Sequence, residues 1–203
     1  MYRVSFYIDG FNLYHSLKDN AKDCRWLDLR KLCESQISKD KEVISDIYYF
    51  SALATWSTNA DTVAKHKKYI NRLEQESIKV ILGKFKEKET YCPKCNQTFI
   101  KHEEKQTDVN IALKLVTDGF KDKYDTAILI SGDTDMIPAI LSLKENKPEK
   151  RIGVIFPIRR KTLELESVVN FSRKLSRKNL VSCLFESDTA PEGWIPSNFN
   201  SSN

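Results

Sequence analysis

Short apolar runs alternate along the chain with stretches in which apolar residues recur every three to four positions. Apolar runs bounded by turn residues predict buried strands, and the three-to-four spacing predicts amphipathic helices. The runs predict strands at residues 3–8, 43–53, 78–82, 127–130, 151–156 and 180–185. Helices are predicted at 29–37, 105–116, 134–146 and 163–171. Two more are predicted, one that begins at residue 13 and one that begins at a cap within 57–61 and ends near residue 75. This alternation indicates an α/β fold with a mainly parallel sheet that helices cover on both faces.

Acidic residues stand at the ends of two predicted strands, where each strand gives way to a helix. Asp9 follows the strand at 3–8, and Asp133 and Asp135 follow the strand at 127–130. In an open α/β sheet, ligands bind just outside the carboxyl ends of the strands. One aspartate in such a place is usually only a helix cap, but two close together after a buried strand suggest a nearby cation.

A fourth carboxylate, Asp108, lies near the predicted start of helix 105–116, where the helix dipole favours an anion and capping is the simplest interpretation. Parallel strands place their carboxyl ends on one edge of the sheet, so Asp9, Asp133 and Asp135 should converge there and Asp108 can join them. Four carboxylates in one pocket repel one another unless a cation is bound. Because all-oxygen ligation suits Mg²⁺ or Mn²⁺, the sequence predicts a divalent metal site.

Residues 84–104 interrupt the alternation with a highly charged segment that contains the motif Cys92-Pro-Lys-Cys95. A Cys-x-x-Cys turn presents two thiolates to one metal ion, but a structural zinc site needs four ligands. The other ligands would be His102 together with Glu103, Glu104 or cysteines of a second chain. Zinc binding and an unligated pair of thiols both remain open, whereas a redox dithiol is disfavoured because its strand-to-helix setting is absent.

Two further groups near the same edge are candidates for contacts with a phosphate backbone. Asn12 is close enough in sequence to Asp9 to orient it or to touch a phosphate, although it also suits a helix cap. Arg159, Arg160 and Lys161 follow the fifth predicted strand at its carboxyl end and are expected to meet a substrate backbone. Simple solvation of these charges is the alternative.

Composition limits the class of protein. The 203 residues suit one domain, which we expect at 1–190 with an irregular tail at 191–203, and 40% hydrophobic residues are enough for a core. No apolar run approaches the roughly 18 residues of a membrane span, and no signal peptide is recognisable, so we expect no membrane partner. Five cysteines, an odd number, favour a reducing cytoplasm over a disulfide framework. The net charge of +5 is a weak indication of a polyanionic partner, and a homo-oligomer remains open.

Three short motifs occur in order along the chain, and together they indicate a protein family more specifically than any one of them does. They are Tyr-Ile-Asp-Gly-Phe-Asn-Leu at 7–13, Lys-Gln-Thr-Asp-Val at 105–109 and Ser-Gly-Asp-Thr-Asp at 131–135. In these motifs the sequence resembles the NYN domain, a branch of the PIN-like nuclease superfamily, in its bacterial LabA-like form. The resemblance covers roughly residues 2–185.

This resemblance implies a three-layer α/β/α PIN-like fold with a small cysteine-containing insertion, and metal-dependent cleavage of RNA. The residues that match the family's metal-binding and catalytic positions are Asp9, Asp108, Asp133 and Asp135. Asn12 matches the family's asparagine after the first acidic residue, an orienting or substrate contact. Many PIN-like domains carry a second acid beside the helix aspartate, but Val109 stands there in this chain, which puts a second metal in doubt.

The predicted function is therefore that of a metal-dependent ribonuclease, and an endonuclease is favoured. A metal-activated water would hydrolyse the phosphodiester bond with Mg²⁺ or Mn²⁺ as cofactor. The alternative from another class is a catalytically silent PIN-like module that binds RNA or a protein. A metal-dependent phosphatase acting on a small ester is disfavoured because no Asp-x-Asp pair follows the first strand.

Overall fold

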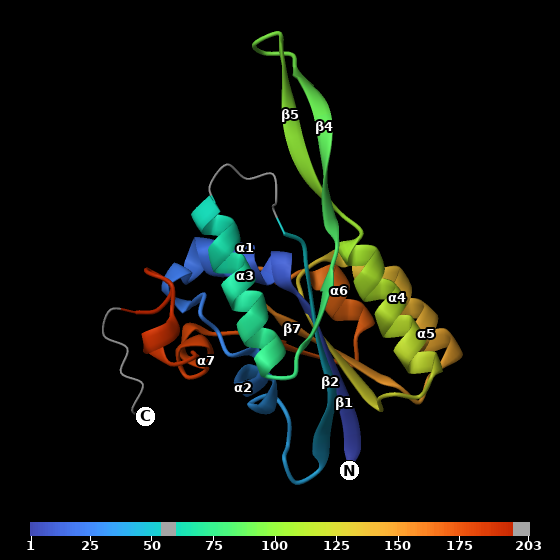
Figure 1. Ribbon diagram of the computed structural model, residues 1–203. Helices are drawn as coiled ribbons and strands as arrows, with labels where there is room; N and C mark the ends of the chain where they lie inside the picture. Colours follow the sequence, from blue (N-terminus) through green and yellow to red (C-terminus); the bar gives the residue numbers. More distant parts are fainter. Residues whose placement is uncertain (54–59, 197–203) are drawn as a thin grey trace.

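Residues 1–53 and 60–196 of the chain are described by the computed structural model (Figure 1). The central sheet has six strands in the order β3-β2-β1-β6-β7-β8, and all five pairings are parallel. Its strands are β1 (Tyr2–Asp9), β2 (Glu42–Ser51), β3 (Lys79–Leu82), β6 (Thr126–Ile130), β7 (Arg151–Phe156) and β8 (Phe171–Lys174). The α/β class and the parallel central sheet are thus confirmed.

Helices cover both faces of this sheet, and alternation along the strands separates two cores (Figure 1). Side chains of β1 at positions 4, 6 and 8 enter one core, while Tyr7 enters the other. The first core is covered by α1 (Gly10–Asn20), α2 (Leu29–Glu34), α3 (Ala60–Gln75) and α7 (Arg177–Val181). The second is covered by α4 (Thr107–Phe120), α5 (Ile137–Asn146) and α6 (Leu163–Val168). Short 3₁₀ helices occur at Lys22–Cys24, Thr134–Met136 and Ser187–Thr189.

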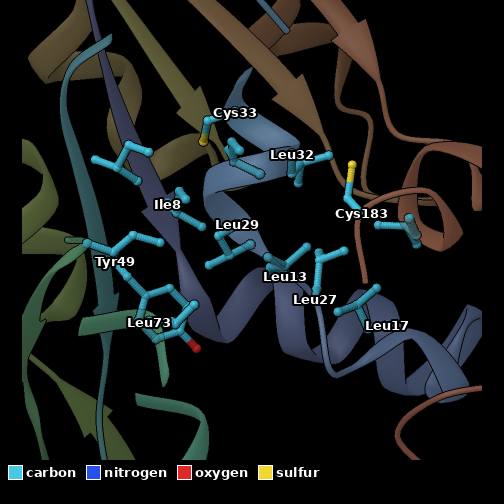
Figure 2. Close-up of a cluster of buried hydrophobic side chains, with 14 of the residues drawn as sticks. Ile8, Leu13, Leu17, Leu27, Leu29, Leu32, Cys33, Tyr49, Leu73 and Cys183 are labelled. Carbon is cyan, nitrogen blue, oxygen red and sulfur yellow. The ribbon is translucent and has the colours of Figure 1, made fainter. Parts of the chain in front are cut away.

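The first core fixes the N-terminal part of the chain against the sheet. Figure 2 shows Leu13 and Leu17 of α1 in the same cluster as Leu29 and Leu32 of α2, with Ile8 of β1 next to Leu29. All five side chains are buried. The end of β1 and the start of α1 are therefore held by packing on both sides, which places Asp9 between them in a fixed position.

The order of the strands creates a crevice at one position in the sheet. From β1 the chain moves outward through β2 to β3, and it later returns to place β6 on the other side of β1. Connections that leave two adjacent parallel strands in opposite directions open a crevice at their carboxyl ends, where open α/β sheets bind ligands. Asp9 ends β1, and Asp133 follows β6 by three residues, so both lie at this crevice.

The charged insertion forms an antiparallel hairpin of β4 (Lys84–Cys92) and β5 (Gln97–Lys105), separate from the central sheet. The hairpin projects away from the body of the protein (Figure 1). Cys92 pairs with Gln97 at its tip, and Lys84 pairs with Lys105 at its root. The root lies directly before α4, so the hairpin rises next to the helix that carries Asp108.

The prediction of a strand at 180–185 is wrong. The sixth strand of the sheet is Phe171–Lys174, whereas the apolar run at 180–185 contains the end of α7 and one isolated bridge between Leu27 and Leu184. A capping box formed by Ser176 and Asn179 starts α7 instead. The predicted helix caps at 57–59 lie outside the described residues. Among the residues that the structure describes, no helix is long and apolar enough to cross a membrane.

The sheet-facing side of α4 also differs from the prediction. The three-to-four spacing of Val109, Ala112, Leu113 and Val116 predicts an apolar face of this helix. Ala112 and Val116 do pack against the second core, but the side chains of Val109 and Leu113 are 59% and 61% exposed. Ile111 and Leu115 are buried instead. They share a helical stripe with Asp108, since residues three and seven positions apart lie on one face. The packing that buries Ile111 and Leu115 therefore turns Asp108 towards the sheet edge.

Candidate metal centre

Asp9 is the most buried acidic group at the carboxyl edge of the sheet, with 3% of the residue exposed. Its Oδ1 accepts a hydrogen bond from the backbone N–H of Asn12 at 3.0 Å, so it is the N-cap of α1. Its Oδ2 accepts a hydrogen bond from the Ser131 hydroxyl at 2.7 Å. The capping interpretation is correct, and it also fixes the direction of the carboxylate.

A glycine directly after Asp9 makes the tight strand-to-helix turn possible. A Cβ at Gly10 would lie 2.6 Å from the carbonyl oxygen of Phe50 and 2.5 Å from the ring of Tyr49. Any larger residue would push the first turn of α1 away from β2. The glycine lets α1 start against the sheet, so Asp9 stays at the edge.

The loop after β6 is tied to the end of β1 and the first turn of α1 by side-chain hydrogen bonds. The Asn12 side-chain oxygen accepts a hydrogen bond from the Gly132 N–H at 3.1 Å, and the Ser131 hydroxyl accepts one from the Asp133 N–H at 3.0 Å. Ser131 therefore links Asp9 to the backbone of Asp133. Asn12, predicted as an orienting or substrate contact, orients the loop that carries Asp133.

Three of the predicted acids come together at this crevice. Asp9, Asp108 and Asp133 each offer one carboxylate oxygen, and these oxygens lie within 4.8 Å of one another; we call these three residues the acid cluster. Asp9 is buried, Asp133 is half-buried and Asp108 is exposed. Asp135 lies outside the cluster, with its backbone N–H donating to Asp133 Oδ1 at 3.0 Å.

The electrostatics of the acid cluster favour a bound cation. Burial, partly offset by the hydrogen bonds from Asn12 and Ser131, raises the pKa of Asp9 to about 6, and the charges of Asp108 and Asp133 add to the rise. The pKa of Asp108 is also raised, first by partial desolvation of its carboxylate and then by the charges of Asp133 and Asp135. A divalent cation would remove this repulsion, and three converging carboxylates are a donor set that suits Mg²⁺ or Mn²⁺.

An open pocket of about 560 Å³ adjoins the acid cluster between α4, α5 and α6. Asp108, Asp135 and Glu164 supply its acidic lining. Val109 and Ile137 are among the apolar residues that line it. Asp135 therefore faces the open space beside the cluster.

The predicted basic residues lie in the loop after β7, residues 157–161, which we call the basic loop. A Cβ at Gly132 would lie 2.0 Å from the carbonyl oxygen of Arg160, so the basic loop packs directly on the turn before Asp133. Arg160 pairs with Asp19 at 3.0 Å, and Lys161 pairs with Glu166. Arg159 is exposed and has a positive φ of 57°. Exposed ion pairs are weak, so all three cations remain able to meet an anion.

Two polar residues of the centre were not predicted for these roles. Ser131 is fully buried and joins Asp9 to Asp133; the only sequence signal for it is its place in the Ser-Gly-Asp motif. Glu104, considered above as a zinc ligand, lies at the root of β5 and accepts a hydrogen bond from the Thr107 hydroxyl. Burial and the nearby Asp108 raise the pKa of Glu104, so this carboxylate borders the acid cluster.

The hairpin cysteines lie far along the strands from the residues proposed to complete a zinc site with them. His102 pairs with Glu87, whereas Gln97 pairs with Cys92. Five residues of strand separate Gln97 from His102, about 16 Å at the usual rise. Glu103 and Glu104 lie still further from the tip, so completion of the site by His102 with either glutamate is wrong.

Comparison with known proteins settles the family. Residues 3–171 match the NYN domain. The chain belongs to the NYN domain family. NYN domains are nuclease-type domains of the PIN-like class, so the family and the acid cluster agree on the kind of site present.

Two further proteins are similar to this chain, one in sequence and one in structure. The NYN chain is 28% identical over 187 residues to the 6-hydroxy-3-succinoylpyridine 3-monooxygenase HspA of Pseudomonas putida. That alignment covers 76% of the chain but 59% of HspA, so the chain spans less than two thirds of its relative. The chain is also similar to the crystal structure of a protein of unknown function from Vibrio parahaemolyticus, with a TM-score of 0.62 and 14% sequence identity. The match covers 91% of this chain and 96% of the Vibrio chain. This second likeness supports the fold alone.

Proposed function

We propose that this NYN domain is a metal-dependent ribonuclease that hydrolyses phosphodiester bonds of RNA, with an endonucleolytic mode favoured. The observation that carries the proposal is the convergence of Asp9, Asp108 and Asp133 within 4.8 Å at the carboxyl edge of the sheet. These three carboxylates would hold Mg²⁺ or Mn²⁺. When bound, the cation would supply Lewis-acid activation of a water and of the leaving oxygen.

Residues of the chain itself would prepare this reaction. Ser131 and Asn12 hold Asp9 and the Asp133 loop in place through their hydrogen bonds, so the acid cluster is organised before substrate arrives. Asp135, beside the cluster, is placed to orient a water or to add a ligand. Arg159 and its neighbours in the basic loop would meet the phosphates that flank the scissile bond.

The activity in the name of HspA is a rival that the chemistry of the site disfavours. If such an oxygenase worked with non-haem iron, it would typically need two histidines and one carboxylate as ligands. Among the described residues, the group of side chains able to share one metal ion is made of three aspartates. An all-carboxylate set suits hydrolysis with Mg²⁺ or Mn²⁺ better than activation of oxygen. A silent RNA- or protein-binding module remains the other rival.

The test is an assay of purified protein on labelled linear and circular RNA and on DNA of the same sequence. We expect RNA cleavage with Mn²⁺ or Mg²⁺, none with EDTA, and cleavage of the circle because an endonuclease needs no end. Asp133→Asn should abolish cleavage while the protein stays folded. Oxygen uptake with 6-hydroxy-3-succinoylpyridine and an added two-electron donor such as NADH is measured in parallel, and uptake without any nucleic-acid cleavage would favour the oxygenase.

Asp28→Asn is the matched control for Asp133→Asn. Asp28 is also an N-cap, accepting a hydrogen bond from the Lys31 N–H at 2.9 Å, but it lies beside Glu76 and Arg72. We expect the control to retain full cleavage. RNA binding by the wild type without cleavage under any divalent cation would establish the binding module instead.

A further inference from the structure

The five cysteines of the chain fall into two kinds of environment. Three lie in or beside the core, where burial raises the pKa of each thiol: Cys24, Cys33 and Cys183. Cys92 and Cys95 instead lie at the tip of the β4–β5 hairpin, where Cys95 is exposed and Cys92 is half-buried. Apolar packing accounts for the first three, and it does not account for the pair at the tip.

The tip holds these two thiols together in a defined turn. Asn96, directly after Cys95, has a positive φ of 51°, a conformation that asparagine tolerates better than most residues. Its side-chain oxygen accepts a hydrogen bond from the Tyr91 hydroxyl at 2.8 Å, which ties the turn to β4. The turn is therefore held by contacts of its own, although it lies far from the core.

Donor groups of this turn surround the sulfur of Cys92, and the thiolate is the form of cysteine that binds metals. The donors are the Cys95 backbone N–H, the Cys95 thiol and the Lys94 backbone N–H. Amide groups directed at a sulfur stabilise its negative charge. The two thiols thus resemble half of a tetrahedral sulfur site.

One chain cannot complete such a site. A closed structural zinc site takes four ligands, and the tip supplies two. Within the part of the chain that the structure describes, three or more potential ligands meet only at the acid cluster. His102 is about 16 Å along β5 from the tip. The missing pair must come from outside the chain, and a second copy carries a matching pair.

We propose that one zinc ion joins two copies of the chain at their hairpin tips, bound by Cys92 and Cys95 of each copy. The hairpin projects from the body (Figure 1), so two tips can meet without a collision between the domains. Apolar side chains near the tip, Tyr91, Phe99 and Ile100, are 59%, 50% and 57% exposed, which gives the second copy a surface to cover. A twofold axis through the zinc presents the same patch from both copies.

The chemistry of this junction balances without any redox step. Each thiol releases its proton on binding, so four protons leave and four thiolates surround Zn²⁺ with a net charge of −2. An exposed Lys94 lies within the turn of each copy, and the two lysines together offset that charge. Metal binding also orders a two-stranded hairpin, which alone is marginally stable in water.

The experiment measures zinc content and mass of the full chain together, by elemental analysis and by light scattering during size-exclusion chromatography. The expected result is half an equivalent of zinc per chain and twice the mass of the monomer. A chelator such as phenanthroline should return the protein to the monomer. Replacement of zinc by Co²⁺ should give the visible absorption of a tetrahedral thiolate site. Cys92→Ser with Cys95→Ser should lose both the zinc and the dimer.

A matched variant tests whether the two thiols, and not the hairpin tip in general, are required for the zinc dimer. Gln97→Ser with Thr98→Ser alters two residues beside the tip without removing a thiol or Lys94, and it should keep the zinc dimer. Circular dichroism should show that the serine variants remain folded, since the tip is outside the core. A monomer with or without zinc, a dimer that survives chelation, or a dimer that only a reductant dissociates would each overturn the proposal.

Discussion

Replacing Asp9 by asparagine should make the metal-free protein more stable at neutral pH, although it removes a residue of the acid cluster. Asparagine keeps an oxygen that can accept the Asn12 N–H, but it carries no charge. In the native protein, burial and the neighbouring acids raise the pKa of Asp9 from 3.8 to about 6. The charged form is therefore an unfavourable one in the folded chain without a cation.

The magnitude follows from this pKa. One pKa unit corresponds to about 1.4 kcal/mol, so the rise from 3.8 to about 6 costs the folded state about 3 kcal/mol above pH 6. Below pH 3.8 the carboxyl is protonated in both states and contributes no penalty. Between these values the folded chain holds a proton that the unfolded chain has lost, so wild-type stability falls as the pH rises. In a domain of this size, 3 kcal/mol is roughly 6–12 °C in melting temperature.

The assay is thermal and urea unfolding of both proteins in EDTA from pH 4 to pH 8. The stability advantage of Asp9→Asn should grow from pH 4 to pH 6 and then stay constant. Mn²⁺ should raise the melting temperature of the wild type by mass action and leave that of the variant nearly unchanged. Asp28→Asn, at a cap outside the acid cluster, should leave the Mn²⁺ response intact. A variant that is less stable than the wild type at pH 7, or a difference that does not change with pH, would refute the reasoning.

Three further predictions test other parts of the centre and the second core beside it. Arg159→Ala should weaken RNA binding for every sequence and reduce the slope of log K against log salt by about 1, as measured by fluorescence anisotropy. Gly132→Ala should destabilise the protein and slow cleavage, since a Cβ would lie 2.0 Å from a carbonyl oxygen of the basic loop; unfolding and activity assays measure both. Tyr7→Phe should cost about 1–3 kcal/mol in urea unfolding, because it removes the hydrogen bond to buried Asp118, whereas exposed Tyr2→Phe should change little.

Parallel topology made the approach of Asp9 and Asp133 predictable from the sequence. Each follows a buried apolar strand and precedes a helix, and parallel strands bring such positions to one edge. The bond between Ser131 and Asp9 was not predictable in the same way. It depends on the two strands being neighbours, and the order of strands in a sheet is set by contacts between distant segments.

The errors have a common physical origin in segments whose apolar pattern fits more than one arrangement. In α4, residues 109–116 are apolar on almost all sides, so spacing alone cannot select the buried stripe. The packing of Ile111 and Leu115 selects it. The apolar run at 180–185 satisfies a strand pattern, but the capping box that begins at Ser176 favours a helical turn before it.

The position of β6 in the chain has a consequence for synthesis of the protein. β1 is made first, but its partner β6 ends at residue 130, after nearly two thirds of the chain. Until β6 emerges, β1 exposes an apolar edge from Val4 to Ile8 that can pair with other chains, a recognised aggregation hazard. A metal ion cannot stabilise the nascent chain at this stage, because the acid cluster forms only after β6 has paired with this edge of β1.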